Sequence, residues 1–218
     1  MSLQLYYITV WSILLPLVMS FVRLKRISTT FYPFLFVIWG GCINEITGHW
    51  VVSRGYSNAI PSNIFNLLEA CFIIWFFYKI DSPGYIRKIW VLLLFLFLAG
   101  WGFENVFIGK FGIYFNSYFN MFSGMAIVLI SINAINEMLV KERELLKNST
   151  FLLCIAFIIY FTYRILVEAF WLYGGNIGPG FMIKVYHIHS WINLLCNIIF
   201  ACAILWMQKR QAFTLQYS

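Results

Sequence analysis

Seven apolar stretches, each about twenty residues long, take up most of the chain and constrain what it can fold into. They occupy residues 4–22, 30–52, 62–80, 88–108, 114–139, 150–173 and 182–207. A helix of about 20 apolar residues crosses the hydrocarbon core of a bilayer, and only short connections remain between these stretches. The chain is 62% hydrophobic and 11% charged, well below the charge of an ordinary soluble domain. The sequence therefore predicts an all-α integral membrane protein, a single domain over residues 1–218 formed by a bundle of seven transmembrane helices.

The distribution of Lys and Arg predicts the orientation of these helices. With the amino terminus outside, eleven basic residues fall on the cytoplasmic side and three outside, and Arg164 is the fifteenth, inside an apolar stretch. Cytoplasmic segments of membrane proteins carry such an excess of positive charge. The net charge of +7 therefore reflects the ends of the spans and forms no continuous basic stripe, which argues against binding of nucleic acid. We expect the carboxyl terminus to be cytoplasmic. A composition rich in Ile, Phe and Asn favours the inner membrane of a bacterium.

Polar residues within the apolar stretches gather in the half of the membrane that is predicted to face outward. Four of the eight acidic residues lie there, and the three histidines and several asparagines share the layer. The members that we single out as ligand-binding candidates, besides Arg164, are Glu45, His49, Glu69, Glu104, Asn116, Asn120, Glu168, His189 and Asn193. Ionisable residues inside a membrane mark functional sites by default, because burying them in hydrocarbon is unfavourable. The sequence therefore predicts an outward-facing polar cavity.

Arg164 is the most constrained of these residues, because it lies near the middle of the stretch 150–173. A guanidinium at that depth has to face the bundle interior and find a partner. Glu168 lies on the same helix face, four residues further on, and Glu69 can reach Arg164 from a neighbouring helix. One interpretation is a structural ion pair with Glu69. In the other, Arg164 anchors a ligand, and protons, a cation or a positively charged ligand balance the excess of glutamates.

Helical spacing places several of the other candidates on common faces. Residues four apart share a face, as in the pairs Glu45 with His49, His189 with Asn193, and Asn116 with Asn120. The asparagines have two interpretations, as hydrogen-bonding contacts between helices or as groups that orient a ligand. We expect a carrier or receptor for a small polar or cationic ligand or for protons, embedded in the lipid bilayer and without a cofactor.

A weak internal repeat bears on the layout of the bundle. Phe65-Asn-Leu-Leu68 in the third stretch matches Ile192-Asn-Leu-Leu195 in the seventh, and the preceding helices both carry an outer glutamate. Three helices, a linking helix and three more in the same direction would form a parallel 3+1+3 repeat. This layout resembles that of the sugar-transporting SWEET and the vitamin-transporting PnuC families. The resemblance is one of layout, because the chain contains no Pro-Gln pair.

Two alternatives from other functional classes stay open. Seven-helix membrane hydrolases resembling alkaline ceramidases and adiponectin-receptor-like proteins bind zinc through histidines and a carboxylate. Here His49, His189 and Glu45 are the candidate ligands, with Glu69 as the base for metal-bound water. The chain has only three histidines in all. The other alternative is a non-catalytic subunit of a membrane complex or a homo-oligomer, in which a partner buries the polar layer.

The predicted orientation can be tested at Asn148-Ser-Thr150, the only glycosylation sequon of the sequence. Because this sequon lies on the cytoplasmic side, it should remain unmodified in a eukaryotic membrane. The measurement is the electrophoretic mobility of the expressed protein before and after treatment with an endoglycosidase. A sequon introduced into the predicted outer loop near Ser57 should be modified and serves as the control. Glycosylation of Asn148 would reverse the orientation.

Overall fold

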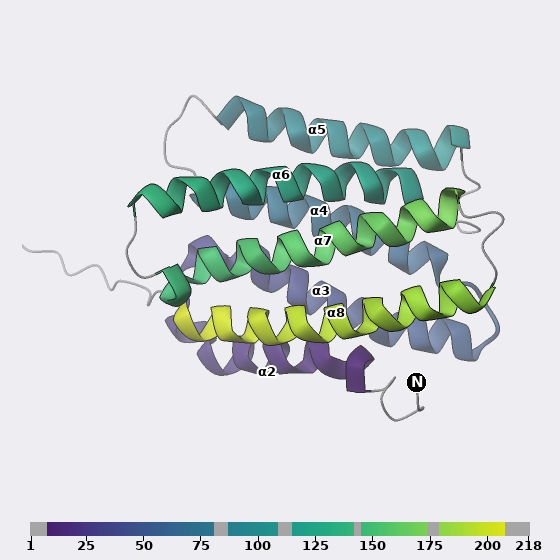
Figure 1. Cartoon of the computed structure of the whole chain (residues 1–218), viewed down its shortest axis with the longest axis horizontal. Helices are drawn as coiled ribbons and strands as arrows, with labels where there is room; N and C mark the ends of the chain where they lie inside the picture. Colours follow the sequence, from purple (N-terminus) through teal and green to yellow (C-terminus); the bar gives the residue numbers. More distant parts are fainter. Residues whose placement is uncertain (1–7, 81–86, 109–114, 142–144, 174–178, 208–218) are drawn as a thin grey trace, which may run out of the picture.

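A computed structural model shows the chain as a bundle of long helices (Figure 1). It describes residues 8–80, 87–108, 115–141, 145–173 and 179–207, and these residues contain no strand that would form a sheet. The α-helices are α2 (Leu14–Arg23), α3 (Tyr32–Ser53), α4 (Ala59–Ile80), α5 (Arg87–Phe103), α6 (Ser117–Lys141), α7 (Ser149–Tyr173) and α8 (Pro179–Trp206). A 3₁₀ turn, Trp11–Ile13, leads into α2, and a π-helical turn, Glu104–Ile108, continues α5. The predicted all-α class is confirmed.

Within the described residues, six helices are long and apolar enough to cross a membrane. They correspond to Ile8–Arg26, Ala59–Ile80, Lys88–Ile108, Ser117–Val140, Ser149–Tyr173 and Gly180–Trp206. The remaining long helix, α3, has 22 residues. Its polar residues Asn44, Glu45 and His49 lower its hydropathy. The helices thus support a multi-pass membrane protein, whereas the seventh crossing, the orientation and the internal repeat stay predictions.

The helix boundaries lie within a few residues of the predicted ones, and α4 shows why they differ. This helix begins at Ala59, three residues before the predicted start at 62, and the backbone N–H of Ala59 donates to the hydroxyl of Ser57 over 3.2 Å. Pro61 therefore lies inside the first turn. Proline is tolerated there because the first backbone N–H groups of a helix have no partner within the helix.

The packing order places α7 between α6 and α8. On the other side of the bundle α3 packs against α4, and α2 packs against both α3 and α8. The α5 helix lies at the edge of the bundle in Figure 1 and packs against α4 and α6. As a result, α3, α4, α6, α7 and α8 surround a common interior, and α5 stays outside it.

Four phenylalanines form the centre of the apolar core. Phe34 of α3, Phe76 of α4, Phe157 of α7 and Phe200 of α8 are all buried. The ring of Phe157 lies 6.1 Å from Phe34, 6.2 Å from Phe76 and 5.8 Å from Phe200, measured between centroids. Aromatic rings at such distances and angles attract one another beyond simple burial. This cluster holds four helices together.

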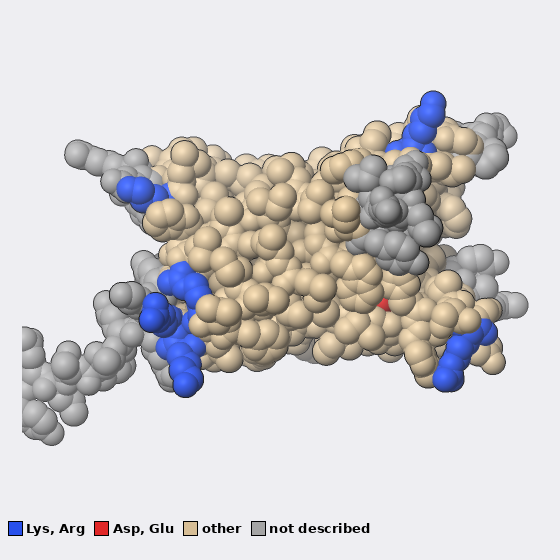
Figure 2. All heavy atoms as spheres, turned by 90° about the horizontal axis from the view of Figure 1, so that it is seen from below, with Lys and Arg blue, Asp and Glu red and all other residues tan. Residues whose placement is uncertain are grey.

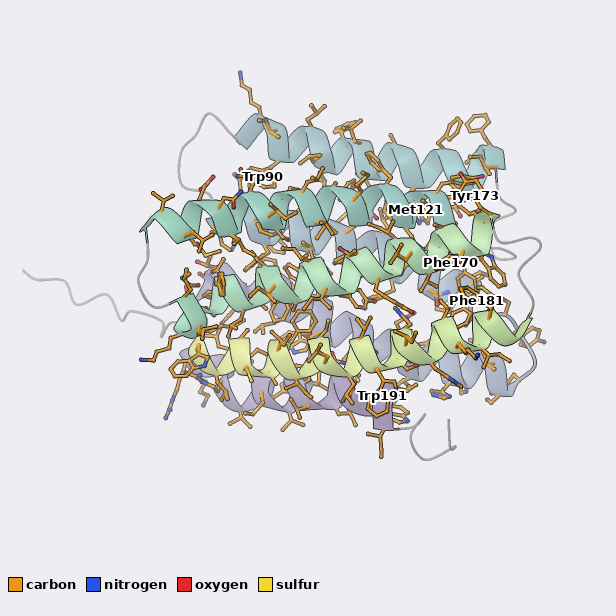
Figure 3. The ribbon with its side chains drawn as sticks, in the orientation of Figure 1. Trp90, Met121, Phe170, Tyr173, Phe181 and Trp191 are labelled. Atoms are coloured by element: carbon orange, nitrogen blue, oxygen red, sulfur yellow. The ribbon has the colours of Figure 1, made fainter. Side chains whose placement is uncertain are left out.

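The outer surface suits a lipid environment. In Figure 2, Lys and Arg gather at the two ends of the molecule, and the middle of that face carries neither. Large apolar side chains are exposed elsewhere on the bundle as well, for example Leu92 and Phe95 of α5 at 59% and 69%. Contiguous apolar patches of this kind on a protein surface mark contact with a membrane or a partner. Figure 3 shows the sidedness of α8, with Trp191 pointing outward and Phe181 meeting Phe170 of α7 at 5.3 Å between ring centroids.

The close approach of α6 and α7 depends on Gly124. A Cβ atom at this position would lie 3.1 Å from Cγ1 of Ile165 and 3.5 Å from the ring of Phe161. We expect Gly124→Leu to lower the free energy of unfolding by about 1–3 kcal/mol, because overpacking separates the two helices. Thermal unfolding in detergent measures the effect.

Gly102→Leu is the matched control for Gly124→Leu. Gly102 is also helical, but a Cβ atom there meets no described atom within 4 Å. This change should leave stability the same or raise it, since glycine is a poor helix former. Equal stability of the two leucine variants would contradict the packing of α6 against α7.

Candidate functional site

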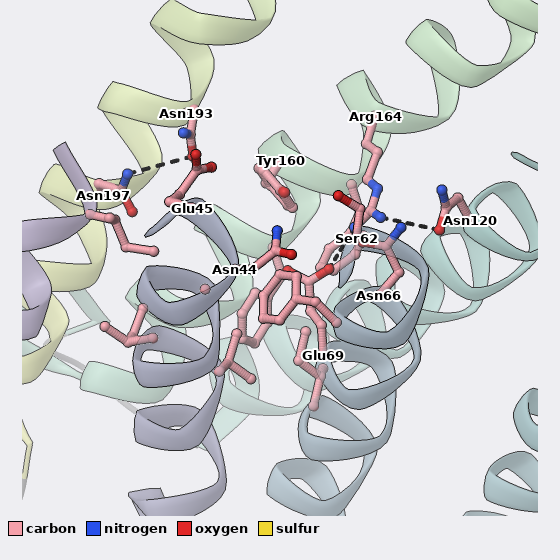
Figure 4. A pocket seen from close by; sticks show the side chains of 18 of the residues that line it. Asn44, Glu45, Ser62, Asn66, Glu69, Asn120, Tyr160, Arg164, Asn193 and Asn197 are labelled. Carbon is pink, nitrogen blue, oxygen red and sulfur yellow. Dashed lines mark hydrogen bonds and ion pairs between the residues drawn. The ribbon is translucent and has the colours of Figure 1, made fainter. Parts of the chain in front are cut away.

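A cavity of about 250 Å³ opens between the helices in the half of the bundle nearer the α3–α4 connection (Figure 4). The turn Trp11–Ile13 and the helices α3, α4, α6, α7 and α8 all contribute to its wall. Its apolar lining includes Val37, Ile73, Phe157 and Phe200, so it lies against the aromatic core. Its polar lining consists of Asn44, Glu45, Ser62, Asn66, Glu69, Asn120, Tyr160, Arg164, Glu168, His189, Asn193 and Asn197.

An ion pair between Arg164 and Glu69 connects α7 to α4 at this cavity. Nη1 of Arg164 lies 2.5 Å from Oε2 of Glu69, and the two side chains are 12% and 7% exposed. Nη2 of Arg164 donates a second hydrogen bond, of 3.1 Å, to Oδ1 of Asn120 in α6. The guanidinium therefore has both a counter-charge and a neutral acceptor, as a charge removed from water requires. The structure thus contains the ion pair with Glu69 that one of the two interpretations of Arg164 predicted.

Glu168 belongs to the same hydrogen-bond network but contacts neutral donors. Its Oε1 accepts from Nδ2 of Asn120 over 2.7 Å, and its Oε2 accepts from the hydroxyl of Ser117 over 2.6 Å. Asn120 thus bridges Arg164 and Glu168, accepting from one and donating to the other. The side chains of Glu69, Ser117, Asn120, Arg164 and Glu168 form one connected network, here called the Arg164 network, which joins α4, α6 and α7.

The rest of the polar lining contrasts with the Arg164 network. Within the described part of the chain, six cavity-lining side chains make no hydrogen bond: Asn44, Glu45, Ser62, Asn66, Tyr160 and His189. Two of their atoms, Oδ1 of Asn44 and Nδ1 of His189, are also buried. Buried polar atoms in folded proteins nearly always have a partner, so such a group calls for an explanation. This set of six is called the open polar group below.

Figure 4 shows how the two sets are distributed across the cavity. Arg164 and Asn120 lie at one end, and Glu45, Asn193 and Asn197 lie at the other, with Tyr160 and Asn44 between them. At the Glu45 end, Nδ2 of Asn197 donates to the hydroxyl of Ser12 over 2.7 Å. Glu45 has no ion pair among the described residues. The positive charge of the cavity is therefore engaged at one end, while a carboxylate is left without a salt-bridge partner at the other.

Seven of the ten side chains that the sequence analysis selected line this cavity: Glu45, Glu69, Asn120, Arg164, Glu168, His189 and Asn193. His49 does not, and its ring stacks on Trp11 with 5.7 Å between the ring centroids. Asn116 also lies outside the cavity lining. It precedes α6, and its backbone N–H donates to Oδ1 of Asn63 over 3.0 Å. His49 and Asn116 therefore belong to the support of the site rather than to its wall.

Glu104 is the third candidate outside the cavity, and it caps α6. Its two carboxylate oxygens accept hydrogen bonds from the backbone N–H groups of Tyr118, at 3.1 Å, and Phe119, at 2.6 Å. These are two of the N–H groups that the first turn of a helix leaves unpaired, and a negative charge at a helix amino terminus is also favoured by the helix dipole. Glu104 is 5% exposed, so its position at the start of the π-helical turn that continues α5 is structural.

Six polar residues of the site did not enter the candidate set, namely Asn44, Ser62, Asn66, Ser117, Tyr160 and Asn197. Tyr160 lies one turn before Arg164 on α7 and shares its face, and Ser117 lies one turn before Asn120 on α6. Their helical spacing from Arg164 and Asn120 is the signal that would have found them. Single hydroxyls in an apolar sequence do not otherwise stand out.

The metal ligands considered for a zinc enzyme are not gathered into one set. Among the described residues, no group of three or more His, Cys, Asp or Glu side chains is placed to hold a metal ion. Glu45 and His189 line the cavity, but His49 lies against Trp11 instead. The structure therefore does not bring the described side chains of His49, His189 and Glu45 together as one ligand set.

Comparison of the chain with protein families, with curated proteins and with solved structures gives no match.

The capping role of Glu104 predicts a loss of stability in Glu104→Ala. This variant leaves the N–H groups of Tyr118 and Phe119 without their acceptors, and loss of a cap costs about 1–2 kcal/mol of unfolding free energy. Thermal unfolding in detergent is the measurement. Glu137→Ala is the control, because Glu137 is an exposed acid of α6, the helix that Glu104 caps, and its carboxylate accepts a hydrogen bond from Asn133 one turn away. This change should alter stability by less than about 0.5 kcal/mol. Equal effects of the two changes would contradict the cap.

Proposed function

We propose that this protein is a multi-pass membrane protein that binds a small polar or cationic ligand, or protons, in the cavity, as a carrier or a receptor. In this proposal α3 also spans the membrane, with its residues Asn44 and Glu45 turned toward the cavity. The observation that supports the proposal most directly is the open polar group beside Glu45. A membrane protein gains nothing in stability from polar groups left without partners, so a ligand gives them a reason to be there.

The charges of the lining favour a cation over an anion. The described lining contains one basic residue, Arg164, against the three acids Glu45, Glu69 and Glu168. Arg164 is already engaged by Glu69 and Asn120, so it has little left to offer an anion. A cation near Glu45 would give this carboxylate the ion-pair partner that the described residues do not provide.

The open polar group can receive an ammonium group in particular. A primary ammonium has three N–H donors and no acceptor. The cavity offers three acceptors: the carboxylate of Glu45 at one end, and Oδ1 of Asn44 and the hydroxyl of Tyr160 between the two ends. His189 offers a further acceptor when its Nδ1 is unprotonated. A proton carried on Glu45 would satisfy the same charge requirement without an organic ligand.

The size and the apolar floor of the cavity limit the ligand further. A volume of about 250 Å³ equals that of about eight water molecules. The floor against Phe157 and Phe200 accepts an aliphatic or aromatic body. The ligand is therefore a small cation with an apolar part, bound with its charge toward Glu45.

Binding of simple ammonium ions tests this proposal. Butylammonium should raise the melting temperature of the purified protein in a concentration-dependent manner, because a ligand that binds the folded state stabilises it. Butyrate and butanol, which have the same chain without the positive charge, should have much weaker effects. Glu45→Gln should weaken butylammonium binding by about tenfold, the value of one charge-assisted hydrogen bond.

The control variant is Glu137→Gln, an exposed acid far from the cavity lining, which should bind butylammonium as the wild type does. Stabilisation by butyrate instead, or an equal response of wild type and Glu45→Gln, would contradict a cation site. Uptake of labelled butylammonium into proteoliposomes then separates the two roles. Accumulation indicates a carrier, and saturable binding without accumulation indicates a receptor.

A further inference from the structure

A second cavity, of about 490 Å³, lies at the opposite end of the bundle from the α3–α4 connection. It is formed where α4 and α8 end and where the segments leading into α3 and α7 begin. The polar side chains that carry the argument are Ser28, Thr30, Lys79, Lys147, Ser149 and Thr150. None of the described residues of this lining is acidic. The cavity therefore has a positive character, in contrast to the one beside Arg164.

Lys79 is held over this cavity by its surroundings. It is in the last turn of α4, and its Nζ lies 3.4 Å from the carbonyl oxygen of Thr29 and 5.3 Å from the ring centroid of Trp75. Lys147 approaches from the turn that precedes α7. Two lysines from different elements therefore line the same cavity.

Ser149 is the observation that points to a ligand independently of charge. It is the first residue of α7 and only 4% exposed, yet its hydroxyl makes no hydrogen bond within the described residues. The side chain of Asn148 already accepts the backbone N–H groups of Thr150, at 2.8 Å, and Phe151, at 3.2 Å. The cap of α7 is therefore complete without Ser149, which leaves its hydroxyl available in the cavity wall.

We propose that this second cavity binds a phosphate group. Lysine ammonium groups and hydroxyls are the donors that phosphate oxygens accept, and the first turn of a long helix adds a favourable field. The phosphate belongs either to the headgroup of an anionic phospholipid or to a soluble phosphate compound. With the orientation predicted from the sequence, the site faces the cytoplasmic leaflet, where anionic lipids attract basic residues. This site is separate from the cavity beside Arg164, and the proposal does not depend on the function proposed for that cavity.

The test compares two probes on the full-length protein in detergent. The first probe is phosphatidylglycerol, set against diacylglycerol with the same acyl chains but no phosphate, with bound lipid counted by native mass spectrometry. The second is inorganic phosphate set against chloride at equal ionic strength, with the melting temperature as the readout. Preference for phosphatidylglycerol over diacylglycerol assigns the site to lipid. Stabilisation by inorganic phosphate, with displacement of any bound lipid, assigns it to soluble phosphate.

The variants locate the binding in this cavity. Lys79→Gln and Lys147→Gln should each weaken binding of the preferred probe by about tenfold, and Ser149→Ala should weaken it by less. Lys88→Gln removes an exposed lysine of α5 that does not line the cavity and should leave binding unchanged. Failure of the wild type to distinguish either probe from its matched control would overturn the proposal. An equal loss in Lys88→Gln and in the two cavity variants would also overturn it.

Discussion

The ion pair between Arg164 and Glu69 is the interaction on which the polar interior depends. A guanidinium inside a helix bundle is strongly destabilising without a counter-charge, and here both side chains are almost fully removed from solvent. Asn120 accepts a hydrogen bond from Arg164 and donates one to Glu168, so the guanidinium of Arg164 connects side chains of α4, α6 and α7. The walls formed by α3 and α8 have no such cation. Their carboxylate, Glu45, and their imidazole, His189, are left without hydrogen bonds from the described residues, and this asymmetry is what makes one half of the cavity a candidate binding surface.

The aromatic core separates two chemically opposite cavities. Phe157 and Phe200 form part of the floor of the cavity beside Arg164. Phe31 belongs to the wall of the second cavity, at the other end of the bundle, and its ring lies 6.0 Å from that of Phe76. The rings of Phe34 and Phe76 lie within the same buried cluster, so no polar path joins the two cavities through these side chains. Passage of a ligand across the membrane would require this cluster to open, whereas a receptor could transmit binding through small shifts of it.

The fold class followed from the sequence because apolar length is a local property, and six helices long and apolar enough to span a membrane occupy the predicted stretches. The ion pair of Arg164 with Glu69 was one of two interpretations that the sequence left open, because an intramembrane arginine needs a partner but the sequence does not fix which group provides it. Depth in the membrane was not sufficient to predict the role of Glu104. It belongs to the same predicted layer as the other acids, but its carboxylate caps α6. Helical spacing placed His49 on the same face as Glu45, but it did not predict that the ring of His49 stacks on Trp11, a residue far away in the sequence. Which residues of different helices meet depends on how each helix is rotated about its own axis. A single sequence does not specify this rotation.

A double-mutant cycle on the ion pair tests the central claim most directly. The unfolding free energies of wild type, Arg164→Leu, Glu69→Gln and the double variant would be measured in the same detergent. A structural pair predicts that Arg164→Leu alone is destabilising by about 3–5 kcal/mol, because it leaves Glu69 buried without its partner. The double variant should then recover a large part of that loss, with a coupling energy of about 1–3 kcal/mol. Additive effects, or an Arg164→Leu variant as stable as wild type, would contradict the account and make Arg164 itself the group that awaits a ligand.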